Sequence, residues 1–225
     1  MFKEIFIGIS SLLTTETSAL SPNVNLSPIR VVYNSLAREN TLSELDKINL
    51  KMINFQVEFN ESVLPKFLTN RQKLAKLVPG GELDDIESIR KYYLIWRFAE
   101  DAYGIKWTAL MLEQAHESTF SKNPIAFYPN RLVIGAMQRS RELYPQSQVE
   151  EAARGYEFLA KLPQNHPTDW KEIMWAAWKL DQDARATVNA DKKDRNWVIG
   201  DAIERYSPDG QKRREEFEVL RGIFG

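Results

Sequence analysis

The sequence predicts an all-α protein, and three observations support this fold class. Apolar residues recur at spacings of three and four along most of the chain, as they do on one face of a helix. No alternating apolar and polar run of useful length occurs, so we expect no extended β-sheet. Only 10 Gly and 10 Pro are present in 225 residues, which argues against a fold built from many tight turns.

The first 20 residues have two interpretations. Lys3 is followed by an apolar stretch over residues 5–13, and the small residues Thr17 and Ala19 come after it, which is the pattern of a signal peptide over residues 1–20. Against this, Glu4 cancels the charge of Lys3, and Gly and Ser interrupt the apolar stretch. The alternative is a first helix or strand of the mature protein.

Residues 21–82 are predicted to form a linker and a helical extension. Pro22 and Pro28 lie in a Ser- and Asn-rich linker. Thr41 and Glu44 have capping-box spacing, which predicts the start of a helix. The apolar face of this helix repeats at Leu45, Ile48, Met52, Phe55 and Phe59. A second helix is predicted over residues 63–77, before the helix-breaking sequence at 79–81.

Residues 83–225 are predicted to form the main domain. Asp84 and Asp85 place acidic groups in the first turn of a helix that runs to Ala102, and Gly104 is suited to end it. Further helices are expected over residues 106–118, 134–143, 147–161, 168–188, 195–206 and 209–223, with a loop over 120–133. In the last helix, Lys212-Arg213-Arg214 beside several Glu residues predicts a solvated face.

The composition excludes several kinds of site. Cysteine is absent, which rules out disulfides, a thiol nucleophile and Cys-built zinc or iron–sulfur sites. The two histidines leave little for a metal centre, and we expect no metal and no cofactor. Lys and Arg total 30 against 31 Asp and Glu, so the net charge of −1 favours no nucleic-acid partner. No run of ~18 apolar residues is present, so no stable membrane span is expected.

The helix predicted over residues 106–118 carries the candidate chemistry. Glu113 and Glu117 lie one turn apart on a polar stripe beside a buried stripe, where a cleft would form. The negative end of the helix dipole and the nearby Glu113 are expected to raise the pKa of Glu117. A carboxyl group that keeps its proton near neutral pH can act as a general acid. On spacing alone, a solvated acid at a helix end is the alternative.

The motifs from Gly104 onward resemble those of the catalytic domain of lytic transglycosylases in the lysozyme-like superfamily. That family has Gly-Ile before a helix that ends in Glu-Ser-x-Phe, followed by a Pro-containing loop, Gly-x-Met-Gln and a helix with Ala-x-x-Tyr-Leu. The matching segments here are 104–105, 117–120, 123–124, 135–138 and 151–159. The resemblance covers about residues 86–225. The chain departs from the family pattern at Trp178-Lys179, where the family has Tyr and Asn.

The resemblance implies a lysozyme-like fold and cleavage of β-1,4 glycosidic bonds in peptidoglycan glycan strands by a monomer. Glu117 would be the single catalytic acid, and the product would be that of a transglycosylase or of a muramidase. The implied substrate-binding residues are Ser118, Met137, Gln138, Tyr156, Trp178 and Tyr206. Each has a structural alternative, such as a helix-ending Ser, a core Met or a core aromatic ring. An inactive lysozyme-like scaffold or a helical interaction protein is the competing function.

The resemblance also connects function to localisation. If residues 1–19 are a signal peptide, the protein is expected in the periplasm or cell envelope. Otherwise a cytoplasmic or virion-associated protein is expected.

Overall fold

The computed structural model describes residues 43–78, 80–191, 195–206 and 209–225, and the chain divides into two compact units, residues 1–62 and 63–225. Most of the described residues are helical, which confirms the all-α class. The predicted signal peptide and linker lie outside the described residues. Within them, no helix is both long and apolar enough to span a membrane.

The first unit contributes helix α3, Glu44–Glu58, which continues into a π-helical turn, Phe59–Val63. The predicted capping box is displaced by two residues, because Ser43 and not Thr41 caps the helix. The Ser43 hydroxyl accepts a hydrogen bond from the Asp46 amide at 3.2 Å, and the Asp46 carboxylate accepts one from the Ser43 amide at 3.1 Å. Ile53 and Val57 form the buried side of α3. The predicted apolar face is therefore wrong for this helix, because Leu45 is 64% exposed and Met52 and Phe55 are only half-buried.

The second unit is a helical array with one very short hairpin. Its α-helices are α4 (Leu64–Leu74), α5 (Ile86–Tyr103), α6 (Trp107–Ser118), α7 (Gln146–Ala153), α8 (Asp169–Asp191), α9 (Arg195–Tyr206) and α10 (Gly210–Phe224). The 3-10 turns are Glu82–Asp84, Pro124–Phe127 and Glu157–Lys161, and the antiparallel strands are β1 (Val133–Ile134) and β2 (Arg139–Ser140).

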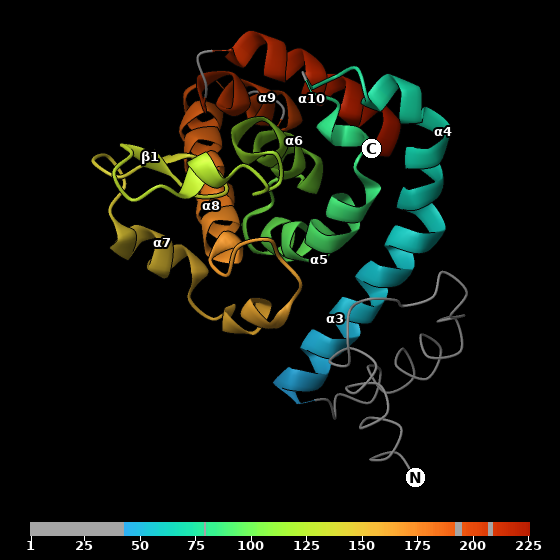
Figure 1. Ribbon diagram of the computed structural model, residues 1–225, viewed down its shortest axis with the longest axis horizontal. Helices are drawn as coiled ribbons and strands as arrows, with labels where there is room; N and C mark the ends of the chain where they lie inside the picture. Colours follow the sequence, from blue (N-terminus) through green and yellow to red (C-terminus); the bar gives the residue numbers. More distant parts are fainter. Residues whose placement is uncertain (1–42, 79, 192–194, 207–208) are drawn as a thin grey trace. The chain divides into compact units, whose positions relative to one another are not determined.

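Helix α8 is central to this unit. It contacts α5, α6, α7 and α9, while α10 packs against α6 and α9 (Figure 1). The helix pair α5 and α6 supplies much of the core, including the fully buried Trp96 and the buried Leu110 and Met111. Gly104 ends α5 with φ of +69°, as the sequence predicts, because only a residue without a Cβ adopts this conformation at little cost.

The helix α4 belongs to the second unit, although the sequence assigned it to the extension before residue 83. The Phe67 ring packs against Trp107 of α6 and Phe224 of α10, with ring centroids 6.4 Å and 4.6 Å apart. The Lys66 ammonium group also donates to the Phe224 carbonyl oxygen at 3.4 Å. These contacts explain why the division of the chain falls at residues 62 and 63.

Two of the predicted helices are wrong. Residues 134–143 form the β1–β2 hairpin instead, because Gly135 and Gln138 both have positive φ, +90° and +47°, which a helix does not accommodate. The helix predicted over residues 147–161 ends at Ala153 and is followed by a separate 3-10 turn. Gly155, with φ of +85°, breaks it.

Candidate active site at the end of helix α6

The candidate acid Glu117 lies in the last turn of α6, next to Ser118, the final helical residue. Its side chain is 18% exposed, so it reaches solvent from the edge of the core. The chain then turns sharply, because Thr119, Phe120 and Ser121 all have φ between +53° and +62°. Three successive non-glycine residues in this conformation are unusual and are held by the surrounding contacts.

The Ser118 side chain connects the end of α6 to the hairpin. Its hydroxyl donates to the Ala136 carbonyl oxygen at 2.7 Å and accepts a hydrogen bond from the Ser121 amide at 2.9 Å. Ser118 is buried. In this structure it therefore fixes the turn after Glu117 and the segment that carries Met137 and Gln138.

Arg213 of α10 joins the two acidic residues of α6. Its Nη1 donates to Glu117 Oε1 at 2.6 Å and also to Glu113 Oε2. Glu113 is completely buried and the Arg213 side chain is 7% exposed. The prediction that residues 212–214 form a solvated face is therefore wrong for Arg213, which points into the α6–α10 contact.

Burial raises the pKa of Glu113 to about 8 from its ordinary value of 4.5. Removal from water is the main cause, the charge of Glu117 acts in the same direction, and Arg213 opposes both. The sequence placed a raised pKa on Glu117, on the strength of the helix dipole. Its neighbour one turn earlier is the more buried carboxyl group, and only the packing of α10 on α6 determines this.

A second set of polar contacts lies next to the Arg213 cluster on the same two helices. His116 Nε2 lies 2.5 Å from Glu216 Oε2, and Lys212 Nζ lies 3.7 Å from Glu216 Oε1. His116 thus has a structural partner in the chain. Among the described residues, no group of three acidic or histidine side chains is placed to hold a metal ion.

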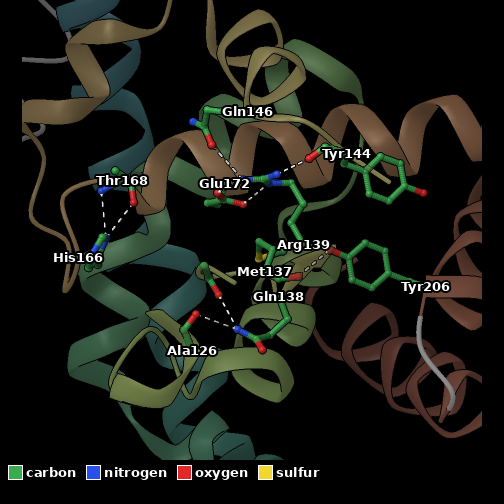
Figure 2. A network of polar contacts seen from close by, with 11 residues as sticks. Ala126, Met137, Gln138, Arg139, Tyr144, Gln146, His166, Thr168, Glu172 and Tyr206 are labelled. Carbon is green, nitrogen blue, oxygen red and sulfur yellow. Dashed lines mark hydrogen bonds and ion pairs between the residues drawn. The ribbon is translucent and has the colours of Figure 1, made fainter. Parts of the chain in front are cut away.

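Tyr206, the last residue of α9, is hydrogen-bonded to the hairpin. Its hydroxyl donates to the Met137 carbonyl oxygen at 2.9 Å (Figure 2). The pKa of Tyr206 is raised well above its ordinary value, first by burial and then by the charges of Glu113 and Glu117. Tyr206 therefore lies within electrostatic range of both carboxyl groups. The Met137 side chain is buried in the core.

Gln138 lies at the turn of the hairpin and is half-buried. Its amide nitrogen donates to the carbonyl oxygens of Gly135 at 3.0 Å and Ala126 at 3.3 Å (Figure 2). These bonds hold its side chain across the base of the hairpin. The positive φ of Gln138 is thus stabilised by its own side chain.

A buried ion pair supports the hairpin from α8. Arg139 of β2 donates from Nε to Glu172 Oε2 at 3.3 Å and from Nη2 to Gln146 Oε1 at 3.0 Å, and it also bonds the Tyr144 carbonyl oxygen (Figure 2). Burial raises the pKa of Glu172, and the Arg139 charge opposes this shift. Sequence spacing predicts neither residue as part of the site, because they are 33 positions apart.

Two predicted substrate-binding residues do not take part in these contacts. Tyr156 packs in an aromatic cluster with Phe158, whose ring contacts Phe98 of α5. Trp178 of α8 is half-buried. None of the hydrogen bonds and ion pairs described above, which join α6, the hairpin, α9 and α10, involves either residue. The hydrogen bonds instead join Ser118 at the end of α6 and Tyr206 at the end of α9 to the hairpin segment that carries Met137 and Gln138.

Comparison with known proteins adds no family to this picture. No protein-family model matches the sequence, and neither a curated protein nor a solved structure matches the chain. The site combines a partly exposed carboxyl group at a helix end, a second carboxyl group whose pKa burial raises, and a hairpin bonded to the neighbouring Ser118.

Proposed function

We propose that this protein cleaves β-1,4 glycosidic bonds in peptidoglycan glycan strands, with Glu117 as the catalytic acid. The observation that carries the proposal is the convergence of the Glu117-Ser118 helix end with the 135–138 hairpin segment, through the 2.7 Å bond from Ser118 to Ala136. These are the motifs on which the resemblance to lytic transglycosylases depends. Tyr206 adds a phenol next to them.

The proposed reaction needs one protein carboxyl group. Glu117 donates its proton to the glycosidic oxygen as the bond from that oxygen to the anomeric carbon of N-acetylmuramic acid breaks. The N-acetyl oxygen of the substrate stabilises the positive charge that develops on the sugar, in the manner of substrate-assisted glycosidases. The 6-hydroxyl group then bonds to the anomeric carbon and returns its proton to Glu117. This sequence consumes no water and leaves a 1,6-anhydro sugar.

The test is digestion of purified sacculi by the wild-type protein and by Glu117→Gln, with mass analysis of the products. Gln keeps the shape of Glu but has no proton to donate, so we expect a loss of about 10²–10⁴-fold. An anhydro product is lighter by one water than a hydrolysis product, which separates transglycosylase from muramidase. Glu204→Gln on α9 is the matched control, since Glu204 is an ion-paired acid outside the site.

The competing proposal is a non-catalytic scaffold, and the ion pair between Arg213 and Glu117 favours it. A guanidinium group in contact with Glu117 stabilises the charged carboxylate, whereas a general acid must carry a proton. If the folded wild-type protein releases no fragments from sacculi, the scaffold replaces the enzyme. If Glu117→Gln is as active as the wild type, Glu117 is not the acid.

A further inference from the structure

The contacts around Arg213 contain an excess of negative charge. One guanidinium nitrogen, Nη1, bonds both Glu113 and Glu117, and Arg213 Nε has no hydrogen-bond partner among the described residues. One positive charge therefore faces two carboxyl groups. In a buried setting a carboxylate without its own counter-charge is costly, so such a pair retains a proton.

The surrounding groups do not supply the missing positive charge. Glu216 of α10 adds another acid, which is paired with His116 and Lys212. From α9 the neutral Tyr206 faces the pair, and Glu172 of α8 is already bonded to Arg139. The other oxygen of Glu113, Oε1, is buried and has no partner within the described part of the chain. A proton on this oxygen leaves the bond from Arg213 to Oε2 intact, and it can reach Glu117 when the Glu113 carboxyl group rotates.

The geometry also keeps the two carboxyl groups close. Two oxygens that both bond the same nitrogen are at most two hydrogen-bond lengths apart. Glu113 is completely buried, while Glu117 is 18% exposed and can meet a ligand. The buried member is suited to hold a proton, and the exposed member is suited to deliver it.

We propose that Glu113 and Glu117 share one proton around Arg213, which Glu113 holds in the free protein and Glu117 delivers to the leaving oxygen. This inference rests on the proposed function. Glu113 is a positioning residue in this scheme, because it acts through Glu117 and does not touch the substrate. The proton lost to the leaving oxygen is recovered from the 6-hydroxyl group at the end of the cycle, so the pair is restored.

The first experiment is the pH dependence of kcat/KM on soluble glycan strands. In the wild type, activity should decline on the alkaline side only when the shared proton is lost. In Glu113→Gln, Glu117 faces Arg213 alone, so the decline should begin at lower pH. If the alkaline decline begins one pH unit lower, kcat/KM at alkaline pH is about tenfold lower than in the wild type. At acidic pH, the two proteins should have nearly equal kcat/KM.

This pattern distinguishes proton sharing from a merely structural role. A structural defect would lower kcat/KM at every pH. If kcat/KM of Glu113→Gln and of the wild type declines at the same alkaline pH, the proposal is overturned. In Arg213→Gln, the alkaline decline of kcat/KM should move in the opposite direction, to higher pH. This protein serves as the second variant if Glu113→Gln does not fold. Glu204→Gln is the control, because Arg214 Nη1 bridges Asp201 and Glu204 in the same manner, at 2.7 and 2.9 Å, on a more exposed surface.

The second experiment needs no activity, so it separates failure of this inference from failure of the proposed function. Carbon-13 NMR of Glu-labelled protein should show a carboxyl signal that titrates at alkaline pH and disappears in Glu113→Gln. In Glu117→Gln, Glu113 should titrate at lower pH than in the wild type, because it then has Arg213 to itself. An unchanged Glu113 titration in Glu117→Gln would show that the two groups share no proton.

Discussion

Gly135 offers the sharpest stability test, because its hairpin segment lies directly over the Arg139–Glu172 ion pair. Gly135 has φ of +90°, and an added Cβ would lie 2.8 Å from Glu172 Cδ and 3.0 Å from Glu172 Cγ. Real Cβ atoms do not approach so closely, so Glu172 must move. We therefore expect Gly135→Ala to destabilise the protein by two separate effects.

The magnitude follows from these two effects. A non-glycine residue at positive φ costs about 1–2 kcal/mol. Displacing Glu172 weakens its hydrogen bonds to Arg139, which are already 3.3 and 3.4 Å long, and such charged bonds contribute about 1.5–3 kcal/mol. The sum is about 2.5–5 kcal/mol. For a protein of this size, that lowers Tm by on the order of 10 °C.

The assay is thermal unfolding followed by circular dichroism, with Gly155→Ala as the matched control. Gly155 has φ of +85°, but nothing lies within 4 Å of the added Cβ, so only the backbone cost of about 1–2 kcal/mol applies. The difference between the two variants measures the contact with Glu172. Equal losses of Tm would refute the argument that Gly135 is required by the ion pair beneath it.

Three further predictions concern the raised pKa of Glu113, the hydrogen bond of Tyr206 and the packing of Gly210. The pKa of Glu113 is raised to about 8 from 4.5, so between these pH values the native protein holds a proton that the unfolded chain releases. The unfolding free energy should therefore fall as pH rises from about 4.5 to 8. Denaturant unfolding should show a flatter pH dependence in Glu113→Gln. Tyr206→Phe removes the bond to the Met137 carbonyl oxygen, and it should lower the unfolding free energy by about 0.5–1.5 kcal/mol in denaturant unfolding. Cleavage of sacculi should also be reduced. Unchanged stability would show that this bond contributes nothing. Gly210→Ala should abolish folding at moderate temperature, because its Cβ would overlap the backbone carbonyl group of Glu204, and a well-folded variant would contradict that packing.

Local rules of the sequence predicted the helices well. The Gly104 helix end, the helix α6 that follows it and the position of Glu117 in its last turn all depend on residues within a few positions of one another. Helices α8, α9 and α10 were predicted within about three residues at each end for the same reason. Backbone hydrogen bonds in a helix are local, so sequence spacing is sufficient to predict them.

The hairpin and the charged cluster could not be predicted in this way. Val133-Ile134 and Arg139-Ser140 are too short to show a strand pattern, and the positive φ of Gln138 depends on bonds to Ala126 and Gly135. Arg213 looks like any other charge on a helix face, and its partners Glu113 and Glu117 are about a hundred positions earlier in the chain. Only the packing of α10 on α6 removes Glu113 and Arg213 from water and leaves Glu117 partly exposed, and burial is what turns ordinary surface charges into a coupled site.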